Sequence, residues 1–193
     1  KGYDIFGNPL RLREHAFNLD GSGYAEVADI NLTTDDFTLA LWVKPSQYDF
    51  DATDPKQMLF GCGLGNFMFD LSVTKIRAVS GHFIDQNISY SFIADVWYYV
   101  TVTRVKSGLQ KIYVNASEIG SIASSTTQAS ATTVTLGTTS THSSRESYSI
   151  VDEHKIYNRA LTQKEITQNY NVGLPVHTNP SSYSGDYSSD YGF

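Results

Sequence analysis

Residues 149–170 constrain the fold more than any other stretch, because they read as a strand that runs directly into a helix. In an extended chain, successive side chains point to opposite faces. Ile150 and Ile156 would then share one face of the strand, and Val151 and Tyr157 would share the other. Apolar side chains on both faces predict a strand that packs against neighbouring structure on each side.

The second half of this stretch has the signals of a helix start. Thr162 and Glu165 have the spacing of a capping box, in which two residues exchange side-chain to backbone hydrogen bonds. Leu161 before the cap and Ile166 inside the helix have the spacing of a hydrophobic staple. Gly173 is a candidate for the residue that ends the helix. The sequence therefore predicts one short helix between Thr162 and Gly173.

The remainder of the chain favours strands. Thirteen Tyr and ten Phe occur among 193 residues, and aromatic residues are enriched in β-sheets. Alternation is clearest in residues 37–45, where one face carries Phe37, Leu39, Leu41 and Val43. Ala40 and Trp42 lie on the other face. Short strands with turn signals about every 8–12 residues predict a two-sheet antiparallel sandwich.

Three motifs point to a known family. Residues 151–161 read V-D-E-H-K-I-Y-N-R-A-L, residues 17–27 read F-N-L-D-G-S-G-Y-A-E-V, and residues 37–45 read F-T-L-A-L-W-V-K-P. Together they resemble strands of the LamG-like jelly-roll domains in the concanavalin A-like superfamily. The resemblance covers residues 17–171 and implies an all-β, two-sheet antiparallel jelly-roll sandwich with one short C-terminal helix. This fold hosts many unrelated functions, so the resemblance names no ligand.

One hairpin departs from the family pattern. Asn115 and Ala116 stand where the family usually has Asp-Gly. Tight hairpin turns need positive φ angles, which favour Gly and Asn over Ala. We therefore do not expect a standard tight turn at this position.

The predicted segments are an N-terminal extension over residues 1–15, the LamG-like domain over residues 16–173 and a tail rich in Ser, Tyr and Gly over residues 174–193. The tail has too little aliphatic surface to fold alone. Its tyrosines recur at intervals of four, at Tyr183, Tyr187 and Tyr191. Tyr gives a large contact area at low entropic cost. We expect these tyrosines to contact another subunit, with folding back onto their own domain as the alternative.

The sequence lacks the motifs of the enzymes in this superfamily. The glucanase pattern E-x-D-x-x-E is absent, and no two of the six Glu residues stand two or four apart on a predicted strand. Retaining glycosidases need two carboxyl groups about 5 Å apart. There is no G-x-S-x-G motif, and the single cysteine, Cys62, has no catalytic signature around it. We predict no catalytic residues, and a glycoside hydrolase or lyase is the least supported class.

The resemblance also implies a calcium site, because LamG-like domains often bind one ion near the opening turn and the closing strand. The matching residues are Asp20 and Asp152, and carboxylate oxygens are ligands that Ca²⁺ prefers. The alternative is that Asp20 only forms a turn and Asp152 only a hydrogen bond. Asp49, Asp51 and Asp54 form either a second metal cluster or a solvated loop.

Carbohydrate binding would use aromatic side chains outside the core. Tyr48, Phe50 and Tyr148 lie in predicted loops and are candidate glycan contacts. Three N-x-S/T sequences are candidate N-glycosylation sites, at Asn31, Asn87 and Asn115.

Charge and hydropathy narrow the classes of partner. The net charge of −6, with no Lys/Arg cluster, argues against nucleic acid. No apolar run approaches the ~18 residues of a membrane span. We expect a non-catalytic structural subunit of an outer-surface assembly (a virion surface, an extracellular filament or a cell coat) that associates with copies of itself or with other surface proteins. The alternative is a carbohydrate-binding or adhesion module, and both roles predict an extracellular or virion-surface location.

Overall fold

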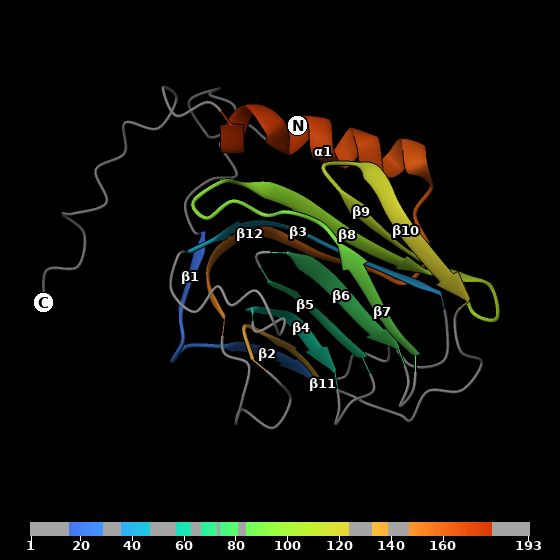
Figure 1. Cartoon of the computed structure of the whole chain (residues 1–193), viewed down its shortest axis with the longest axis horizontal. Helices are drawn as coiled ribbons and strands as arrows, with labels where there is room; N and C mark the ends of the chain where they lie inside the picture. The colour runs from blue at the N-terminus through green and yellow to red at the C-terminus, as the bar shows by residue number, and fades with distance from the viewer. Residues whose placement is uncertain are drawn as a thin grey trace, which may run out of the picture.

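The computed structural model describes residues 16–28, 36–46, 57–62, 67–72, 74–80, 84–123, 133–138 and 147–178. These ranges form two six-stranded antiparallel sheets that face each other, with one helix outside them (Figure 1). The predicted all-β sandwich with a C-terminal helix is confirmed.

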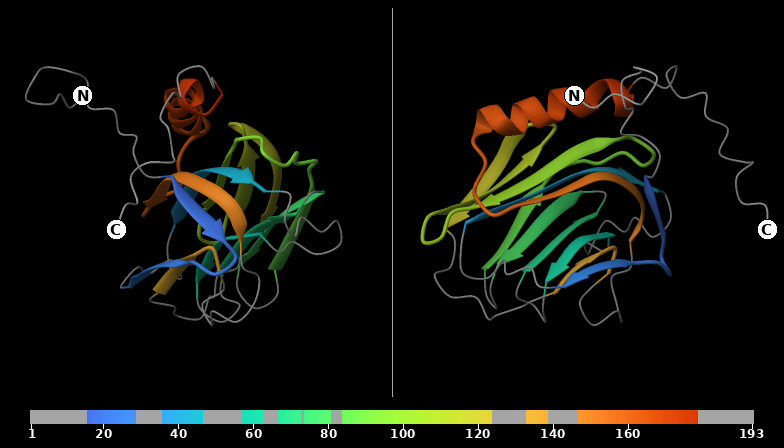
Figure 2. Two further views of the ribbon diagram at one scale, coloured as in Figure 1. Left: turned by 90° about the vertical axis from the view of Figure 1, so that its left-hand side faces the viewer. Right: turned by 180° about the vertical axis from the view of Figure 1, so that it is seen from behind.

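We call the sheet nearest the helix the helix-side sheet; its strand order is β1-β12-β3-β8-β9-β10. Its strands are β1 (Phe17–Asp20), β3 (Phe37–Pro45), β8 (Tyr98–Arg104), β9 (Leu109–Val114), β10 (Ser117–Ala123) and β12 (Tyr148–Tyr157). The second, opposite sheet has the order β2-β11-β4-β5-β6-β7. Its strands are β2 (Ala25–Ala28), β4 (Gln57–Cys62), β5 (Phe67–Ser72), β6 (Lys75–Ser80), β7 (Ile84–Ser89) and β11 (Thr133–Leu136). Helix α1 (Gln163–Thr178) covers the outer face of the helix-side sheet (Figure 2).

The main hydrophobic core lies between the two sheets. Strand β3 contributes Phe37, Leu39, Leu41 and Val43, each at most 1% exposed. Ala40 and Trp42, on the other face of β3, pack in a second cluster with Ile166 of α1. The predicted alternation of β3 is confirmed, and the helix explains why both faces of this strand are apolar.

The predicted start of the helix is also confirmed. The Thr162 N–H donates to Oε2 of Glu165 over 2.8 Å, and the Glu165 N–H donates back to Oγ1 of Thr162 over 3.4 Å. Leu161 and Ile166 are buried in the same cluster, as the staple requires. The cap satisfies backbone donors that have no partner within the first turn of the helix.

The predicted end of the helix at Gly173 is wrong, because α1 continues to Thr178. Gly173 is buried inside the helix, and a Cβ there would overlap the indole of Trp42. Glycine is needed at this position for the close approach of α1 to β3. The first residues of the predicted tail, from 174 to 178, therefore belong to the helix.

The regular alternation predicted for β12 does not hold. The pairing of β12 with β3 shifts register between Asp152 and Lys155, and Glu153 has a φ of 49°. This irregularity is a β-bulge, which inserts an unpaired residue and reverses the faces that follow. As a result Val151 and Ile156 both pack on the core between the sheets. The prediction that Ile150 shares a face with Ile156 is therefore wrong.

The hairpin between β9 and β10 has a tight turn at Asn115 and Ala116, so the prediction of no standard tight turn at this position is wrong. Asn115 and Ala116 have φ angles of 49° and 61°, and two positive φ angles are characteristic of a type I′ turn. The Asn115 N–H donates to the Tyr99 carbonyl over 2.8 Å, and Oδ1 of Asn115 accepts from the Tyr99 N–H over 2.9 Å. Nε2 of Gln163 donates to the Ala116 carbonyl over 2.6 Å. These bonds tie the turn to β8 and to the start of α1.

Candidate ligand-binding groove

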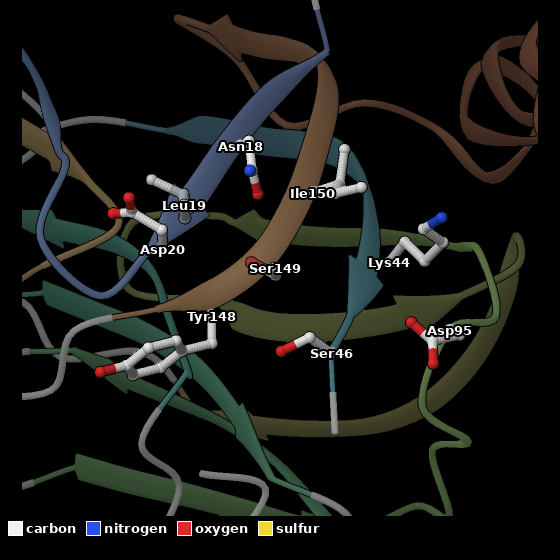
Figure 3. Close-up of a pocket in the computed structure, with 9 residues that line it drawn as sticks. All are labelled: Asn18, Leu19, Asp20, Lys44, Ser46, Asp95, Tyr148, Ser149 and Ile150. Atoms are coloured by element: carbon white, nitrogen blue, oxygen red, sulfur yellow. The ribbon is translucent and has the colours of Figure 1, made fainter. Parts of the chain in front are cut away.

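A groove of about 400 Å³ lies on the outer face of the helix-side sheet, where β1, β12 and β3 run side by side (Figure 3). Its lining residues are Asn18, Leu19, Asp20, Lys44, Ser46, Asp95, Tyr148, Ser149 and Ile150. Most of them are polar, although they come from four separate parts of the chain. The strand register explains how they meet.

One row of groove residues crosses three strands. Asn18 of β1 pairs with Ile150 of β12, which pairs in turn with Lys44 of β3. The neighbouring residues Val43 and Val151 are buried between the sheets. Because side chains alternate along a strand, the row points outward. The floor thus combines an amide, an aliphatic side chain and an ammonium group.

A second row lies next to the first. Asp20 pairs with Tyr148, and the Ser46 N–H donates to the Tyr148 carbonyl over 2.9 Å. The Tyr148 ring rests against Gly21, whose φ is 83° and where a Cβ would overlap the ring. The turn after β1 therefore makes room for Tyr148. Tyr148, a glycan-contact candidate from the sequence, lines the groove.

Asp20 is held by the turn that follows it. Its Oδ1 accepts hydrogen bonds from the Ser22 hydroxyl over 2.7 Å, the Ser22 N–H over 3.0 Å and the Gly23 N–H over 3.2 Å. These bonds, led by that from the Ser22 hydroxyl, lower the pKa of Asp20. The side chain is therefore a fixed carboxylate at one end of the groove.

The loop before β8 forms the wall beside β3. Asp95 has a φ of 61°, and its N–H donates to the Pro45 carbonyl over 2.7 Å. Close to this wall, the Lys44 Nζ lies 5.8 Å from the centre of the Trp97 ring, a cation–π distance. The loop thus adds a carboxylate to the groove and an aromatic partner for its ammonium.

An aromatic cluster borders the groove at the last turn of α1. His177 stacks on Trp42 with ring centres 4.3 Å apart and meets Trp97 edge-on at 4.7 Å. Nε2 of His177 lies 3.1 Å from Oδ2 of Asp152, and Nδ1 lies 2.9 Å from the Gly173 carbonyl. The cluster fixes the end of α1 to β3 and β12.

The structure does not bring the predicted calcium ligands together. Asp20 lies opposite Tyr148, whereas Asp152 is four residues further along β12 and contacts His177. At about 3.4 Å per residue, the separation along the strand is about 14 Å, too far for one ion. No group of three His, Cys, Asp or Glu side chains suited to a metal occurs among the described residues. Calcium binding by this chain stays a prediction.

Several other predicted residues lie apart from the groove. Asn87 is exposed on β7. The side-chain oxygen of Asn115 accepts a hydrogen bond from the Tyr99 N–H. The remaining candidates lie outside the described residues: Asn31, Tyr48, Asp49, Phe50, Asp51, Asp54, Tyr183, Tyr187 and Tyr191.

Sequence reasoning missed Asn18, Lys44, Ser46 and Asp95. The alternation of β3 places Lys44 on the same outer face as Trp42, so the sequence does predict the facing of Lys44. What the sequence does not show is the pairing of β1 with β12 and of β12 with β3, on which the groove depends.

A family model described as the concanavalin A-like lectin/glucanases superfamily matches residues 19–167. The chain belongs to this superfamily. The resemblance inferred from the sequence motifs is therefore confirmed. The description includes lectins and glucanases, so membership establishes the fold and leaves the activity open. No curated protein matches the sequence.

Solved structures with the same fold include a heptameric SAP-like pentraxin from Limulus polyphemus, at 16% identity, with a TM-score of 0.61 and 78% of each chain covered. The binding domain of botulinum neurotoxin DC in complex with SialylT has 17% identity and a TM-score of 0.65, with 86% of this chain and 43% of that chain covered. A botulinum neurotoxin type C structure, described by an interaction with two ganglioside molecules, has 17% identity and a TM-score of 0.59, with 78% and 40% covered. The chain thus spans about two fifths of these toxin chains. Identities this low support a shared fold alone.

Proposed function

We propose that this domain is a non-catalytic binding module that holds an oligosaccharide in the groove on β1, β12 and β3. The observation that supports this most directly is the composition of the groove, in which an apolar floor at Ile150 and Tyr148 is ringed by amide, hydroxyl and carboxylate groups. A sugar ring has an apolar face and a rim of hydroxyls. Such pockets combine apolar surface for affinity with a few polar groups for orientation.

The relatives favour the same class of ligand. Two toxin structures that share this fold at 17% identity are described in complex with SialylT or by an interaction with two ganglioside molecules. They support a glycan as the ligand and carry no argument about the charge of the glycan that this groove binds. Of the helices that the structure describes, none is long and apolar enough to span a membrane. Because the proposed ligand is a glycan, we propose a surface or extracellular location for this module.

The lowered pKa of Asp20 does not suit this carboxyl group to the role of general acid in a glycosidase. A glycosidase needs a general acid whose pKa is raised, so that it holds a proton at neutral pH. The hydrogen bonds from Ser22 and Gly23 shift the pKa of Asp20 in the opposite direction. Asp20 is therefore suited to accepting hydrogen bonds from sugar hydroxyls.

The test is a glycan array with the full chain, followed by calorimetry on the glycans that bind. Asn18→Ala removes an amide from the groove, and we expect about tenfold weaker binding, or ~1.4 kcal/mol. Asn158→Ala is the matched control, since Asn158 is exposed after β12 and does not line the groove. The proposal fails if no glycan binds or if both variants bind like the unchanged chain.

A second candidate is a structural subunit of an outer-surface assembly. The similarity to the pentraxin supports this candidate, because that protein is described as heptameric and 78% of its chain is covered. In this role the chain would associate with copies of itself or with other proteins of a virion surface, filament or cell coat. Light scattering on the full chain and on a chain ending at Thr178 tests it. Assembly through the tyrosine-rich tail predicts an oligomer that only the full chain forms.

A further inference from the structure

We infer that the groove selects neutral oligosaccharides over acidic ones, with Asp20 and Asp95 as the residues that set this specificity. This inference rests on the proposed glycan-binding function and adds the chemical class of the ligand. Its basis is the charge of the lining, which contains two carboxylates and one ammonium group. An acidic sugar brings its own carboxylate or sulfate into this space.

The Asp20 charge is not cancelled by the bonds that hold it. The donors to its Oδ1 are one hydroxyl and two backbone N–H groups, all of them neutral. These donors stabilise the ionised form and leave its net charge in place. Asp20 therefore presents a permanent negative charge at the β1 end of the groove.

Asp95 provides the second negative charge, from the loop on the other side. Its backbone is anchored to Pro45, which places the side chain beside Ser46 at the groove wall (Figure 3). The two carboxylates belong to separate elements, the end of β1 and the loop before β8. A ligand lying across β12 would meet both.

Lys44 offsets this charge only in part. Its ammonium lies over the Trp97 ring, where the negative face of the ring attracts it. The neighbouring carboxylate of Asp152 contacts His177 outside the groove lining. The chain as a whole carries a formal charge of −6, which adds a long-range repulsion for anions.

Neutral sugars can donate hydrogen bonds to both carboxylates without electrostatic repulsion. Hydroxyl groups donate to ionised oxygens in short, charge-assisted hydrogen bonds. An anionic substituent would instead face like charges, which interfaces use to reject wrong partners. The same two residues thus strengthen binding of one class of glycan and weaken binding of the other.

The experiment uses matched glycan pairs, such as lactose and 3′-sialyllactose and longer chains with and without sialic acid or sulfate. Binding of the full chain is measured by array and calorimetry at low and high salt. We expect neutral members to bind at least about tenfold more tightly than acidic members at low salt. The ratio should shrink at high salt, because screening weakens interactions between exposed charges.

Asp20→Asn and Asp95→Asn test the assignment to residues. Asn retains the acceptor that forms the turn at position 20, and it tolerates the positive φ at position 95. Each variant should lower the ratio of neutral to acidic glycan affinity several-fold. Glu118→Gln, outside this groove, should leave that ratio unchanged. Equal or tighter binding of acidic glycans, or an unchanged ratio in both Asp variants, overturns the inference and leaves glycan binding intact. If no glycan of either class binds, the proposed function itself is wrong.

Discussion

The indole of Trp42 lies directly against Gly173, so there is no space between β3 and α1 for a side chain at this position. Trp42 also contacts the helix one turn before and one turn after Gly173. Trp42 also stacks on Tyr170, with ring centres 5.5 Å apart, and on His177 at 4.3 Å. Three residues of α1 thus surround one tryptophan, and this packing fixes the helix on the outer face of the sheet.

We expect Gly173→Ala to destabilise the domain, although alanine is the better helix former by about 1 kcal/mol. The added methyl group would overlap the indole, and overpacking of this kind costs roughly 1–3 kcal/mol. Urea unfolding should therefore show a lower midpoint. Val172→Ala is the matched control, because Val172 is 74% exposed on the same turn. A more stable Gly173→Ala variant would mean that α1 does not pack closely on Trp42.

The facing of β12 before its bulge makes a prediction that distinguishes two adjacent residues. Val151 is 1% exposed in the core, whereas Ile150 lines the groove on the outer face. Val151→Ala should lower the free energy of unfolding by roughly 1–3 kcal/mol, because it leaves a cavity between the sheets. Ile150→Ala should have a much smaller effect on stability. The reverse order in chemical denaturation would mean that Ile150, and not Val151, faces the core between the sheets.

The contrast between β3 and β12 shows which parts of the fold could be predicted. In β3, strict alternation of apolar residues specified both faces, and in α1 the capping box specified the first turn. In β12, the same reasoning failed because a single residue with positive φ, Glu153, reverses the faces. Nothing in the local sequence indicates that Glu occupies this conformation.

The candidate groove was less predictable than the fold. It depends on strand pairs that join residues more than a hundred positions apart, such as Asn18 with Ile150. Local rules associate glycine with helix termini and therefore predict a helix end at Gly173. Its actual role depends on Trp42, which lies far away in the sequence. Long-range packing and register therefore account for most of what sequence reasoning missed.

Ala116 offers a stabilising substitution. Its φ of 61° places an L-residue with a Cβ in the left-handed region, at a cost of roughly 1–2 kcal/mol. Ala116→Gly removes this strain, so we expect a gain of about 1 kcal/mol in the free energy of unfolding. Ala123→Gly, at the end of β10, is the control and should be neutral or destabilising. Thermal and urea unfolding measure both variants, and a destabilised Ala116→Gly would contradict a type I′ turn.

His154 makes the domain sensitive to acid. Its ring stacks on Phe60 of the opposite sheet, with ring centres 4.4 Å apart. Nε2 is buried without a hydrogen-bond partner among the described residues. Burial disfavours the charged ring and lowers the pKa of His154 from 6.5 to about 4. In the unfolded chain the ring is solvated and takes up a proton near its ordinary pKa of about 6.5.

The contribution of His154 to stability is therefore fully present above pH 6.5 and is lost as the pH falls from 6.5 towards 4. The difference between the two pKa values corresponds to a loss of about 3 kcal/mol. His154→Phe keeps the stacking on Phe60 and cannot be protonated, so its stability should fall less over this pH range. Denaturant midpoints measured from pH 7 to pH 4 for both proteins provide the comparison. Parallel pH profiles would mean that His154 is solvated in the folded state.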